Sequence, residues 1–248
     1  MFQDKKVIIV LPAYNAEKTL ENTLKDIPVG VADEIILVDD ASTDGTVGLA
    51  KKIGITVLEH DRNQGYGANQ KTCYTTALDK GAEIIVMIHP DYQYDPRIIP
   101  FAIGFLATGI CDIIIGSRVR TRRETLEGGM PIYKYISNRI LTIFENIALG
   151  QNLGDFHSGF RAYRREVLKT VDFFQNSDDF VFDTEFLAQA VYHNFRIGDV
   201  PIPTRYFAEA SSINFRRSLK YGIQTVMVML KFALAKWGIH KSRIFRIR

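Results

Sequence analysis

The stretch "VMIHPDYQYDP", residues 86–96, is an apolar run that ends in His89, Asp91, Gln93 and Asp95. In an extended segment alternate side chains share a face, so His89, Asp91 and Gln93 are expected to converge on one spot. An imidazole, a carboxylate and an amide oxygen can together bind a metal ion. A metal site and an ordinary polar turn are therefore both open here. Asp95 directly precedes a proline and is predicted to cap a helix.

Two adjacent carboxylates, Asp39 and Asp40, follow another apolar run. Neighbouring carboxylates repel each other unless a cation, the base or ribose donors of a nucleotide, or backbone N–H groups satisfy them. Either residue could instead cap the next turn, although Ser42 and Thr43 are available for that purpose. We therefore predict that the pair contacts a nucleotide.

Two further groups of residues suit a phosphorylated ligand. In "NQGYGAN", residues 63–69, Gly65 and Gly67 lack side chains and so permit a close backbone approach to a ligand. Arg118 and Arg161 carry guanidinium groups that match phosphate oxygens, although each could equally be a solvated surface residue.

Three titratable residues of the second half allow more than one interpretation. His157 is interpreted as a hydrogen-bonded structural histidine, with a ligand contact as the alternative. Asp183 and Glu185 lie near the start of a predicted helix, where the helix dipole stabilises negative charge. Either carboxylate could instead act as a general base.

The elements that must position these residues alternate regularly in the first half. Apolar runs occupy residues 7–11, 34–40, 55–60 and 83–89, and helical patterns occupy residues 16–27, 43–53 and 67–81. Continuous β-branched runs separated by helices predict parallel strands in an α/β doubly wound sheet. Such sheets bind ligands beyond the carboxyl ends of their strands. The polar clusters at residues 12–17, 39–45, 60–67 and 89–93 are therefore expected to meet at one rim.

The second half has a different pattern. We predict a strand over residues 112–118, a mobile basic loop over 119–131, and helices over 133–149, 155–168, 182–193 and 219–237. Isoleucines recur at helical spacing in residues 133–149, and Gly150 is predicted to end that helix. Arg161 is expected to open the helix within residues 155–168.

The helix over residues 219–237 is amphipathic, with Lys220, Gln224 and Lys231 on one stripe. Basic residues flank it: Arg216 and Arg217 on one side, and Lys241, Arg243, Arg246 and Arg248 on the other. Basic flanks around an apolar face suit an anionic membrane surface. Core packing of this helix and attachment to a membrane are both open.

Composition excludes several classes of protein. With 248 residues and 46% hydrophobic content, the chain can bury a substantial core. Its net charge of +3 is too small for a general nucleic-acid binder. Cys73 and Cys111 form neither a zinc framework nor a disulfide scaffold, which favours a reducing interior. The sequence shows no signal peptide and no run of about 20 apolar residues, so we predict a cytoplasmic protein.

An ordered set of motifs spans about residues 7–207: "VIIVLPAYNAEKTL", "VDDASTDGT", "NQGYGAN", "HPDYQYDP", "IIGSR", "DFHSGFRAYRREVL" and "VPIPTRY". This set resembles glycosyltransferase family 2, and within it the polyprenol-phosphate sugar synthases of the dolichyl-phosphate mannose synthase type. The resemblance implies a GT-A fold, a nucleotide-diphosphate sugar donor, a divalent metal ion (Mn²⁺ or Mg²⁺) and inversion at the anomeric carbon.

By position, the resemblance also implies the roles of individual residues. It implies nucleotide contacts by Pro12, Tyr14, Glu17, Asp39 and Asp40, metal ligation by Asp91 and Gln93, a phosphate contact by Arg118, and acceptor-side roles for Ser137, Asp155, Ser158 and Arg161. Gly67 joins the substrate-binding residues because it lies on the shared rim.

The sequence departs from the family pattern at three places. His89 replaces the first metal aspartate, so a ligand set of Asp91, Gln93 and His89 would favour Mn²⁺ over Mg²⁺. Tyr133-Lys134 replaces an arginine pair, which leaves Lys134 as the candidate catalytic residue of the acceptor loop. His157 replaces a threonine.

The leading hypothesis is transfer of a sugar from a UDP- or GDP-sugar to a polyprenyl (dolichyl or undecaprenyl) phosphate at the cytoplasmic face of a membrane. The acceptor oxygen is then already anionic, and no general base is required. An acceptor hydroxyl on a cell-surface glycan would require one, with Asp155, Asp183 and Glu185 as candidates. The third hypothesis is a catalytically silent nucleotide-sugar binding module, which the histidine at position 89 favours.

The expected organisation follows the same hypothesis. We predict a GT-A domain over residues 1–210, with a nucleotide-binding half over 1–118 and an acceptor half over 119–210. Residues 211–248 would form the amphipathic basic helix and tail. Membrane contact is expected through residues 119–131, 133–149 and 219–237.

Overall fold

The structure is a computed structural model that describes residues 4–118, 121–205, 215–239 and 242–245. Predictions that involve Arg120, Lys241, Arg246 and Arg248 lie outside the described residues, as do residues 211–214 of the C-terminal segment. The predicted division of the chain at residues 118 and 210 stays a prediction.

The described residues form one seven-stranded sheet in the order β3-β2-β1-β4-β6-β5-β7. The strands are β1 (Val7–Ala13), β2 (Glu34–Asp39), β3 (Thr56–Glu59), β4 (Ile84–Ile88), β5 (Ile113–Ser117), β6 (Phe160–Arg164) and β7 (Ile197–Pro201). β6 lies between β4 and β5 and pairs antiparallel with both, whereas the other pairings are parallel. The predicted doubly wound, mostly parallel sheet is confirmed.

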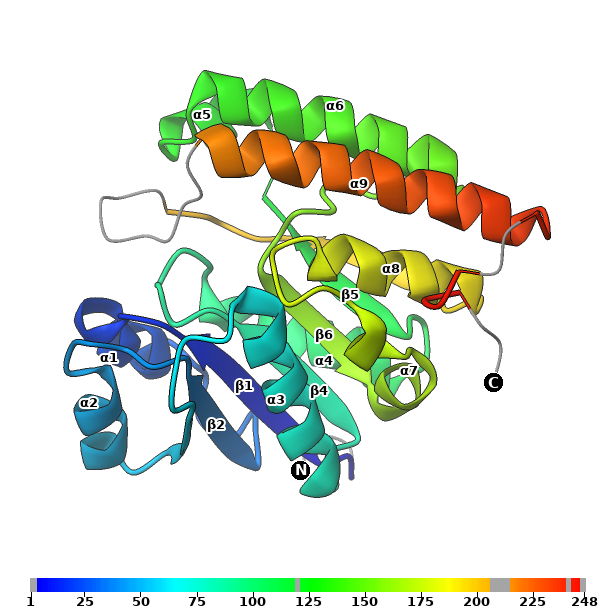
Figure 1. The fold of residues 1–248 in the computed structure, drawn as a ribbon. Coiled ribbons are helices and arrows are strands. Elements are labelled where there is room, and N and C mark those ends of the chain that lie inside the picture. The colour runs from blue at the N-terminus through cyan, green and yellow to red at the C-terminus, as the bar shows by residue number, and fades with distance from the viewer. Residues whose placement is uncertain (1–3, 119–120, 206–214, 240–241, 246–248) are drawn as a thin grey trace.

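Helices cover both faces of the sheet (Figure 1). On one face lie α1 (Glu17–Lys25), α2 (Thr46–Ile53) and α4 (Ile99–Ala107), which follows the short turn Pro96–Ile98; on the other lie α3 (Tyr66–Asp79), α7 (Arg165–Thr170), the turn Phe173–Gln175 and α8 (Phe182–Tyr192). α6 (Ile132–Leu149) and α9 (Phe215–Lys236) lie side by side beyond α8 and form an outer layer, with α5 (Arg122–Glu127) at one end.

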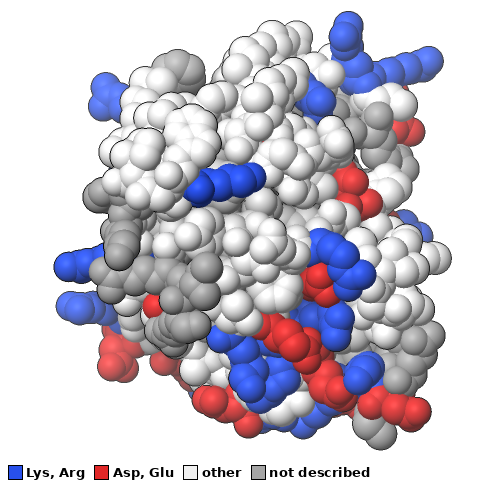
Figure 2. Space-filling model, turned by 90° about the vertical axis from the view of Figure 1, so that its right-hand side faces the viewer, with Lys and Arg blue, Asp and Glu red and all other residues white. Residues whose placement is uncertain are grey.

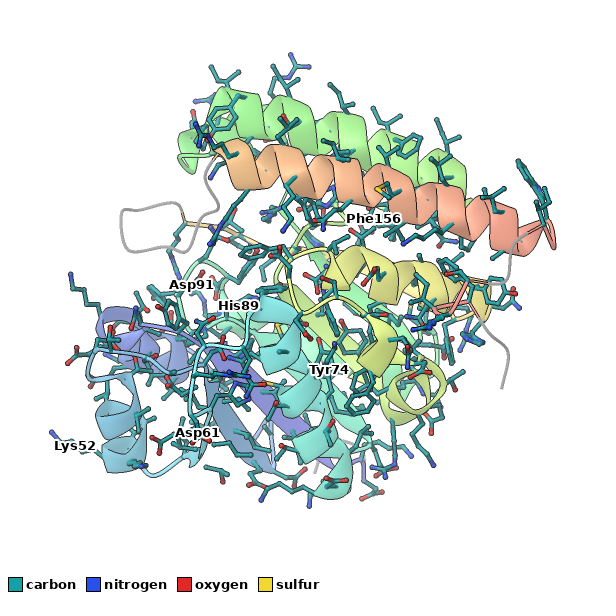
Figure 3. All side chains as sticks on the ribbon, viewed as in Figure 1. Lys52, Asp61, Tyr74, His89, Asp91 and Phe156 are labelled. Carbon is teal, nitrogen blue, oxygen red and sulfur yellow. The ribbon has the colours of Figure 1, made fainter. Side chains whose placement is uncertain are left out.

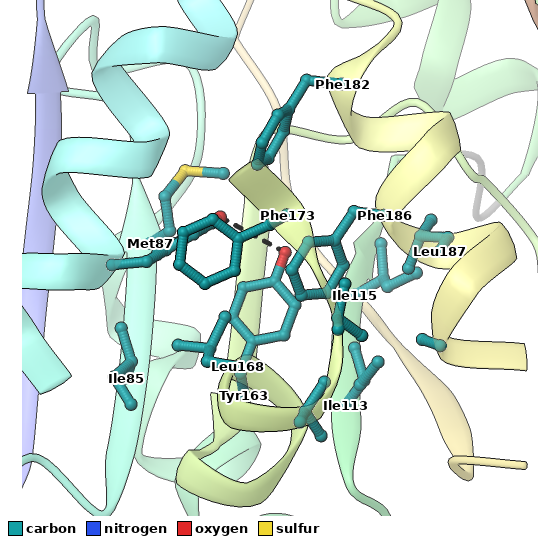
Figure 4. Packing of buried hydrophobic residues seen from close by; sticks show 14 of the residues in the cluster. Ile85, Met87, Ile113, Ile115, Tyr163, Leu168, Phe173, Phe182, Phe186 and Leu187 are labelled. Carbon is teal, nitrogen blue, oxygen red and sulfur yellow. Dashed lines mark hydrogen bonds between the residues drawn. The ribbon is translucent and has the colours of Figure 1, made fainter. Parts of the chain in front are cut away.

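Burial explains why the strands read as continuous apolar runs. Every residue of β1 and β4 is buried, because each strand has helices on both of its faces. On one face, aromatic rings fill the space between β6 and α8, where Tyr163, Phe173, Phe182 and Phe186 pack together (Figure 4). This packing fixes the distance between α8 and the sheet. It therefore also fixes the position of α9, which packs on α8.

The topology switches direction between β1 and β4. From β1 the chain winds outward through β2 and β3 and then returns to β4 on the other side of β1. The loops that leave the two central strands must therefore diverge. This leaves room for a ligand beyond the carboxyl ends of these strands. Asn15, Ala41 and Tyr92, in the loops after β1, β2 and β4, all have positive φ, which is costly for such residues and is concentrated at functional sites.

Two predicted elements of the second half are wrong. Arg161 does not open a helix; it lies within β6, where Phe160 and Ala162 face one core and Tyr163 faces the other. That alternation is the period of a strand, and the helix begins only at Arg165. The predicted loop over residues 119–131 includes a helix, α5, which Thr121 caps by accepting a hydrogen bond from Glu124 N (3.1 Å).

The helix over residues 133–149 is confirmed as α6, and Gly150 ends it with a left-handed φ of 67°. Its orientation is unusual for a water-soluble surface helix. Ile136, Ile140, Ile143 and Ile147 are 51–78% exposed, whereas the polar residues Asn138, Thr142 and Glu145 are buried. α9 likewise exposes Leu219, Ile223, Met227 and Leu230.

The two outer helices lie side by side (Figure 1), and their exposed apolar residues therefore form a shared apolar surface. Figure 2 shows a neighbouring face whose upper part, over the ends of these helices, carries few charged side chains, while charges of both signs gather lower down. Within the described ranges, no helix has the length and hydropathy needed to cross a bilayer.

Candidate functional site

A cleft of about 1230 Å³ lies between the carboxyl ends of the strands and the two outer helices. Each of the four strand-end loops contributes lining residues, among them Tyr14, Asp40, Asn63 and Asp91. Lys134 of α6 and Tyr221 of α9 line the opposite wall. Figure 3 shows His89 and Asp91 at this end of the sheet, below the outer helices. The prediction that the polar clusters meet at one rim is confirmed.

Pro12, Tyr14 and Asp40 line the cleft where a nucleotide contact was predicted. Asp40 accepts hydrogen bonds from the backbone N–H groups of Gln64 (2.8 Å) and Gly65 (2.9 Å), and His60 Nδ1 lies 2.8 Å from its Oδ1. These donors satisfy the carboxylate and tie the loop after β3 to the end of β2. The nucleotide role of these residues stays a prediction.

Glu17 and Asp39 do not line the cleft, and both carboxylates are engaged in contacts within the protein. Asp39 accepts hydrogen bonds from Ser42 N (2.7 Å) and Ser42 Oγ (2.5 Å), which is the capping arrangement considered above as the alternative. Glu17 accepts a hydrogen bond from Gly45 N (3.0 Å). These contacts shape the loops after β1 and β2 instead of facing the cavity.

The missing side chain of Gly67 makes room for the protein's own backbone and not for a ligand. A Cβ at this position would lie 2.3 Å from Ser177 O, and Gly67 N donates to Asp178 O (2.8 Å). Gly65 is under the same constraint, since a Cβ there would lie 2.6 Å from Asp178 O. The glycines therefore dock the start of α3 against residues 177–178, and only Gly65 lines the cleft.

The segment after β4 is a turn, so the expected alternation of side chains in residues 89–93 is wrong. The backbone reverses at Tyr92, which has a φ of 56°, and Gln93 N donates to Asp91 Oδ1 (3.0 Å). His89 is directed toward Tyr66 and the start of β6, where its Nε2 lies 3.3 Å from Tyr66 OH and its ring fills the space left by Gly159. All three predicted ligands nevertheless line the cleft.

The donor set fits a divalent cation only in part. In the part of the chain that the structure describes, no group of three His, Cys, Asp or Glu side chains could hold a metal ion. Asp91 lines the cleft, and the hydrogen bond found for its carboxylate uses Oδ1 alone. A single carboxylate supplemented by substrate phosphates is a common arrangement for Mg²⁺ and similar ions. Asp91 is therefore the residue that fits such a role.

Asp183 is the centre of a polar network on the floor of the cleft. Tyr66 OH donates to it (2.8 Å), Gln70 Nε2 donates to it (3.1 Å), and the buried Arg161 guanidinium lies 3.2 Å away. Burial and the charge of Asp183 raise the pKa of Tyr66 well above its ordinary value, so its phenol stays protonated and donates. Arg161 thus acts through Asp183 in this structure and does not itself line the cleft.

Arg118 and Lys134 are two cations that line the cleft and lie close enough to interact electrostatically. Arg118 Nε donates to Asp155 Oδ2 (2.7 Å), and Asn138 Nδ2 donates to Asp155 Oδ1 (2.9 Å). Burial alone would raise the pKa of Asp155, but the charge and hydrogen bonds of Arg118 outweigh it and lower that pKa. Burial and the nearby Arg118 lower the pKa of Lys134. Two cations that repel each other form a site that an anion would stabilise.

The remaining acceptor-side candidates divide between the wall and the interior. Ser137 lines the cleft from α6. Ser158 is fully buried and accepts a hydrogen bond from Phe160 N (3.2 Å), so it supports the loop before β6. Among the candidate bases, Asp155 and Glu185 are buried outside the lining, whereas Asp183 faces the cleft. His157 is hydrogen-bonded to Tyr221, as its structural interpretation predicted, and it also lines the cleft, so a ligand contact stays a prediction.

Sequence reasoning missed several lining residues. Tyr66, Asn63 and Tyr94 come from the strand-end loops, while Asn138 and Tyr221 come from the outer helices. Tyr66 lies between the two glycines already singled out, so the motif itself carried a usable signal. Asn138 and Tyr221 carried none, because their positions depend on which face of each helix turns inward.

The strand order with β6 reversed, and a cleft at the strand ends, is a GT-A-type arrangement. The glucosyl-3-phosphoglycerate synthase of Mycobacterium tuberculosis, solved with Mn²⁺, UDP and glucosyl-3-phosphoglycerate, has this fold; the match has a TM-score of 0.70 at 20% identity and covers 96% of this chain and 82% of that one. The fold class implied by the motifs is thereby confirmed.

The chain belongs to glycosyltransferase family 2. The model of the family described as Glycosyl transferase family 2 matches residues 8–172. A protein of Methanocaldococcus jannaschii described as uncharacterized is 32% identical over 201 residues, which are 81% of this chain and 82% of that protein. The UDP-N-acetylglucosamine–dolichyl-phosphate N-acetylglucosaminyltransferase of Methanococcus voltae is 26% identical over 245 residues, 92% and 97% of the two chains.

Proposed function

We propose that this family 2 glycosyltransferase moves a sugar from a nucleotide-diphosphate sugar to a polyprenyl phosphate at a membrane surface. One observation carries the proposal: a single cleft leads from the strand-end loops, past Arg118 and Lys134, to a wall formed by two helices whose outer faces are apolar. A relative named for a dolichyl-phosphate acceptor supports the same substrate class. An acceptor with an anionic head and an apolar chain matches both features.

The basic pair would bind the acceptor phosphate. Asp155 orients the Arg118 guanidinium through two of its nitrogens, at 2.7 and 3.2 Å, so the arginine is fixed before a substrate arrives. Preorganised donors stabilise developing charge without reorganisation during the reaction. Lys134 supplies a second positive charge from α6.

The reaction needs only correct placement of the nucleophile. An acceptor phosphate oxygen forms a bond to the anomeric carbon while the bond from that carbon to the diphosphate oxygen breaks. The nucleoside diphosphate leaves with the electron pair, and attack from the opposite face inverts the anomeric centre. Because the attacking oxygen is already anionic, no residue has to remove a proton.

Asp91 is the residue proposed to hold a divalent cation, Mn²⁺ or Mg²⁺, together with the donor diphosphate. When bound, such an ion neutralises charge on the departing diphosphate. His89 faces Tyr66, so we assign it to the cleft floor and not to the ligand set. Asp40 and Tyr14 are proposed to contact the nucleotide at the other end of the cleft.

The outer helices are proposed to lie on the membrane. Their exposed isoleucines, leucines and Trp237 would enter the interface, and the basic residues near α9 would face anionic lipid headgroups. The cytoplasmic side is the proposed location, because Cys73 and Cys111 are free thiols, which a reducing compartment maintains.

A transfer assay tests the proposal. A panel of UDP- and GDP-sugars would be incubated with undecaprenyl or dolichyl phosphate in vesicles, with Mn²⁺, with Mg²⁺ or with chelator, and the lipid extract analysed for a sugar phosphate. We expect one nucleotide sugar to yield a metal-dependent lipid product. Turnover that ignores the lipid but uses a glycan hydroxyl would overturn the proposed acceptor and make Asp183 the candidate base.

The silent-module alternative has its own test. Calorimetry of UDP and GDP with and without Mn²⁺ separates it from an enzyme. Nucleotide binding that is indifferent to metal, combined with no turnover on the panel, would support the silent module. We expect binding that Mn²⁺ strengthens.

A further inference from the structure

His157 joins the loop before β6 to both outer helices. Its Nε2 lies 3.0 Å from Glu145 Oε2 on α6, and its Nδ1 lies 2.8 Å from Tyr221 OH on α9. The His157 ring also packs edge-on against the Tyr221 ring, with centroids 5.4 Å apart. Tyr221 OH lies 3.0 Å from Thr184 Oγ1 of α8, so three helices meet at this histidine.

The same loop also holds Arg118, one of the two cations of the cleft. The His157 backbone N–H donates to Asp155 Oδ1 (2.9 Å), and that carboxylate holds Arg118. The buried face of α6 therefore contacts this loop at two points: Asn138 contacts Asp155, and Glu145 contacts His157. A shift of α6 or α9 against the sheet would be transmitted to Arg118 through this short path.

Simple packing does not account for the arrangement. The Glu145 side chain is fully buried, and neither of its oxygens makes a hydrogen bond of good geometry, although His157 Nε2 lies within ion-pair distance. A buried carboxylate is costly unless it is paired, and apolar residues of similar volume would usually serve stability as well or better. Polar contacts retained at such a place can instead specify one relative position of the elements.

We propose that His157 is a positioning residue for the acceptor. It holds Arg118 at a fixed distance from the two apolar helices, so that the phosphate of a polyprenyl phosphate reaches the guanidinium while its chain lies at the membrane side. His157 does not touch the reacting atoms in this scheme. The inference rests on the proposed function and specifies how its acceptor site is held.

Two substitutions separate the contacts of His157. Glutamine places its amide nitrogen near the position of Nε2, and asparagine near that of Nδ1, so His157→Gln retains the contact with Glu145 and His157→Asn the contact with Tyr221. Tyr221→Phe removes the α9 contact and leaves the pair with Glu145 intact. His193→Gln, at the end of α8 and away from the cleft lining, is the matched control.

The test measures KM for two acceptors and the affinity for the nucleoside diphosphate. For His157→Asn and Tyr221→Phe we expect the KM for long-chain polyprenyl phosphate to rise about tenfold or more, because small misplacements weaken positioning strongly. The effect should be smaller with water-soluble geranyl phosphate, whose short chain does not depend on the helices. His157→Gln loses the same contact with Tyr221 and should raise the KM for the long-chain acceptor about as much as Tyr221→Phe does, and diphosphate affinity should stay within about twofold of the parent value.

The outcomes separate the inference from the proposed function. If the parent protein transfers sugar to no polyprenyl phosphate, the proposed function fails first. If the parent is active and folded Tyr221→Phe keeps both acceptor KM values, the positioning role is overturned, whether or not the His157 variants fold. Equal losses with both acceptors would also contradict it, because they would indicate general structural damage.

Discussion

The two ends of the cleft are built in different ways. At the proposed donor end, Asp39 and Asp40 are held by hydrogen bonds from Ser42, Gln64 and Gly65, which lie within about one strand–helix unit of them. At the proposed acceptor end, Arg118 depends on Asp155 and, through it, on Asn138 of α6. The donor end is thus a local construction, and the acceptor end is assembled from distant segments.

This difference has a physical consequence. Hydrogen bonds to backbone N–H groups fix the donor carboxylates as soon as the β2 and β3 loops form. The acceptor cations are fixed only when α6 and the loop before β6 pack together, and those contacts are also where a membrane would act. We therefore expect substitutions at the donor end to abolish chemistry, and those at the acceptor end to change affinity, stability and membrane dependence.

The largest effect is expected at Asp91. Asp91→Ala should reduce transfer by about 100-fold or more, because a cation that neutralises the diphosphate contributes several kcal/mol to transition-state stability. Thermal melting should be unchanged, since the Asp91 carboxylate accepts only from Gln93 N among the hydrogen bonds described. Asp61→Ala, in an exposed loop outside the cleft lining, is the control. Retained turnover in Asp91→Ala would remove this residue from the mechanism.

Asp155→Asn should lower the free energy of unfolding as well as weaken acceptor binding. The substitution removes the buried charge of Asp155 that pairs with Arg118, and breaking a buried pair costs about 3–5 kcal/mol. Because the pKa of Asp155 is lowered, the stabilisation in the parent is fully present above pH about 4 and is lost below it.

Denaturant unfolding measures this effect, with Asp112→Asn as the control. Asp112 pairs with Arg164 and Arg196 just before the amino end of β5, at the end of the sheet away from the cleft. The control should lose stability without changing the acceptor KM. An equal change in acceptor KM for both variants would show that the acceptor end is not held specifically through Asp155.

Membrane attachment is expected to show an intermediate effect. Ile143→Glu or Ile147→Glu should weaken vesicle binding roughly tenfold, because burying an isoleucine in an apolar phase contributes about 1.5–3 kcal/mol. Ile110→Glu changes a residue of similar exposure, in the loop after α4, and should bind as the parent does. Flotation with anionic vesicles measures the difference, and equal flotation of all three variants would contradict the assignment of the α6 face to the membrane.

The smallest effect is expected from pH. Burial and Arg118 lower the pKa of Lys134, so its charge is lost at a lower pH than for an ordinary lysine. Acceptor KM should therefore rise by a few-fold at a pH still below the ordinary lysine pKa of about 10.4. Lys134→Arg retains its charge there and should flatten the rise. A pH profile of acceptor KM that is identical in both proteins would exclude a binding role for the Lys134 charge.

The same contrast explains what could be predicted from the sequence. The strands over residues 7–11 and 83–89 and the meeting of their loops followed from burial on two faces and from parallel topology. Arg161 was expected to open a helix, but residues 160–164 form β6, which is buried on both faces, and the helix begins only at Arg165. The direction of His89 was missed because the strand ends at Ile88 and residues 90–92 form a turn, with a positive φ at Tyr92.

The orientation of α6 could not be predicted from periodicity. A helical repeat of isoleucines gives the helix but not the side on which the core lies. Here the polar residues Asn138, Thr142 and Glu145 face inward. Asn138 and Glu145 contact Asp155 and His157, which lie in the loop that follows the helix. Their pairing depends on tertiary contacts that the spacing of residues does not encode.

Photo-crosslinking with a polyprenyl phosphate that carries a diazirine in its first isoprene unit tests the central claim most directly. In vesicles supplied with donor nucleotide, we expect labelling of α6 and α9 near Lys134, Ile140 and Ile223. Unmodified polyprenyl phosphate should compete and remove this label. Labelling that competes but maps to α4 or to the loops after β2 and β3 would contradict the claim that one cleft joins both substrates.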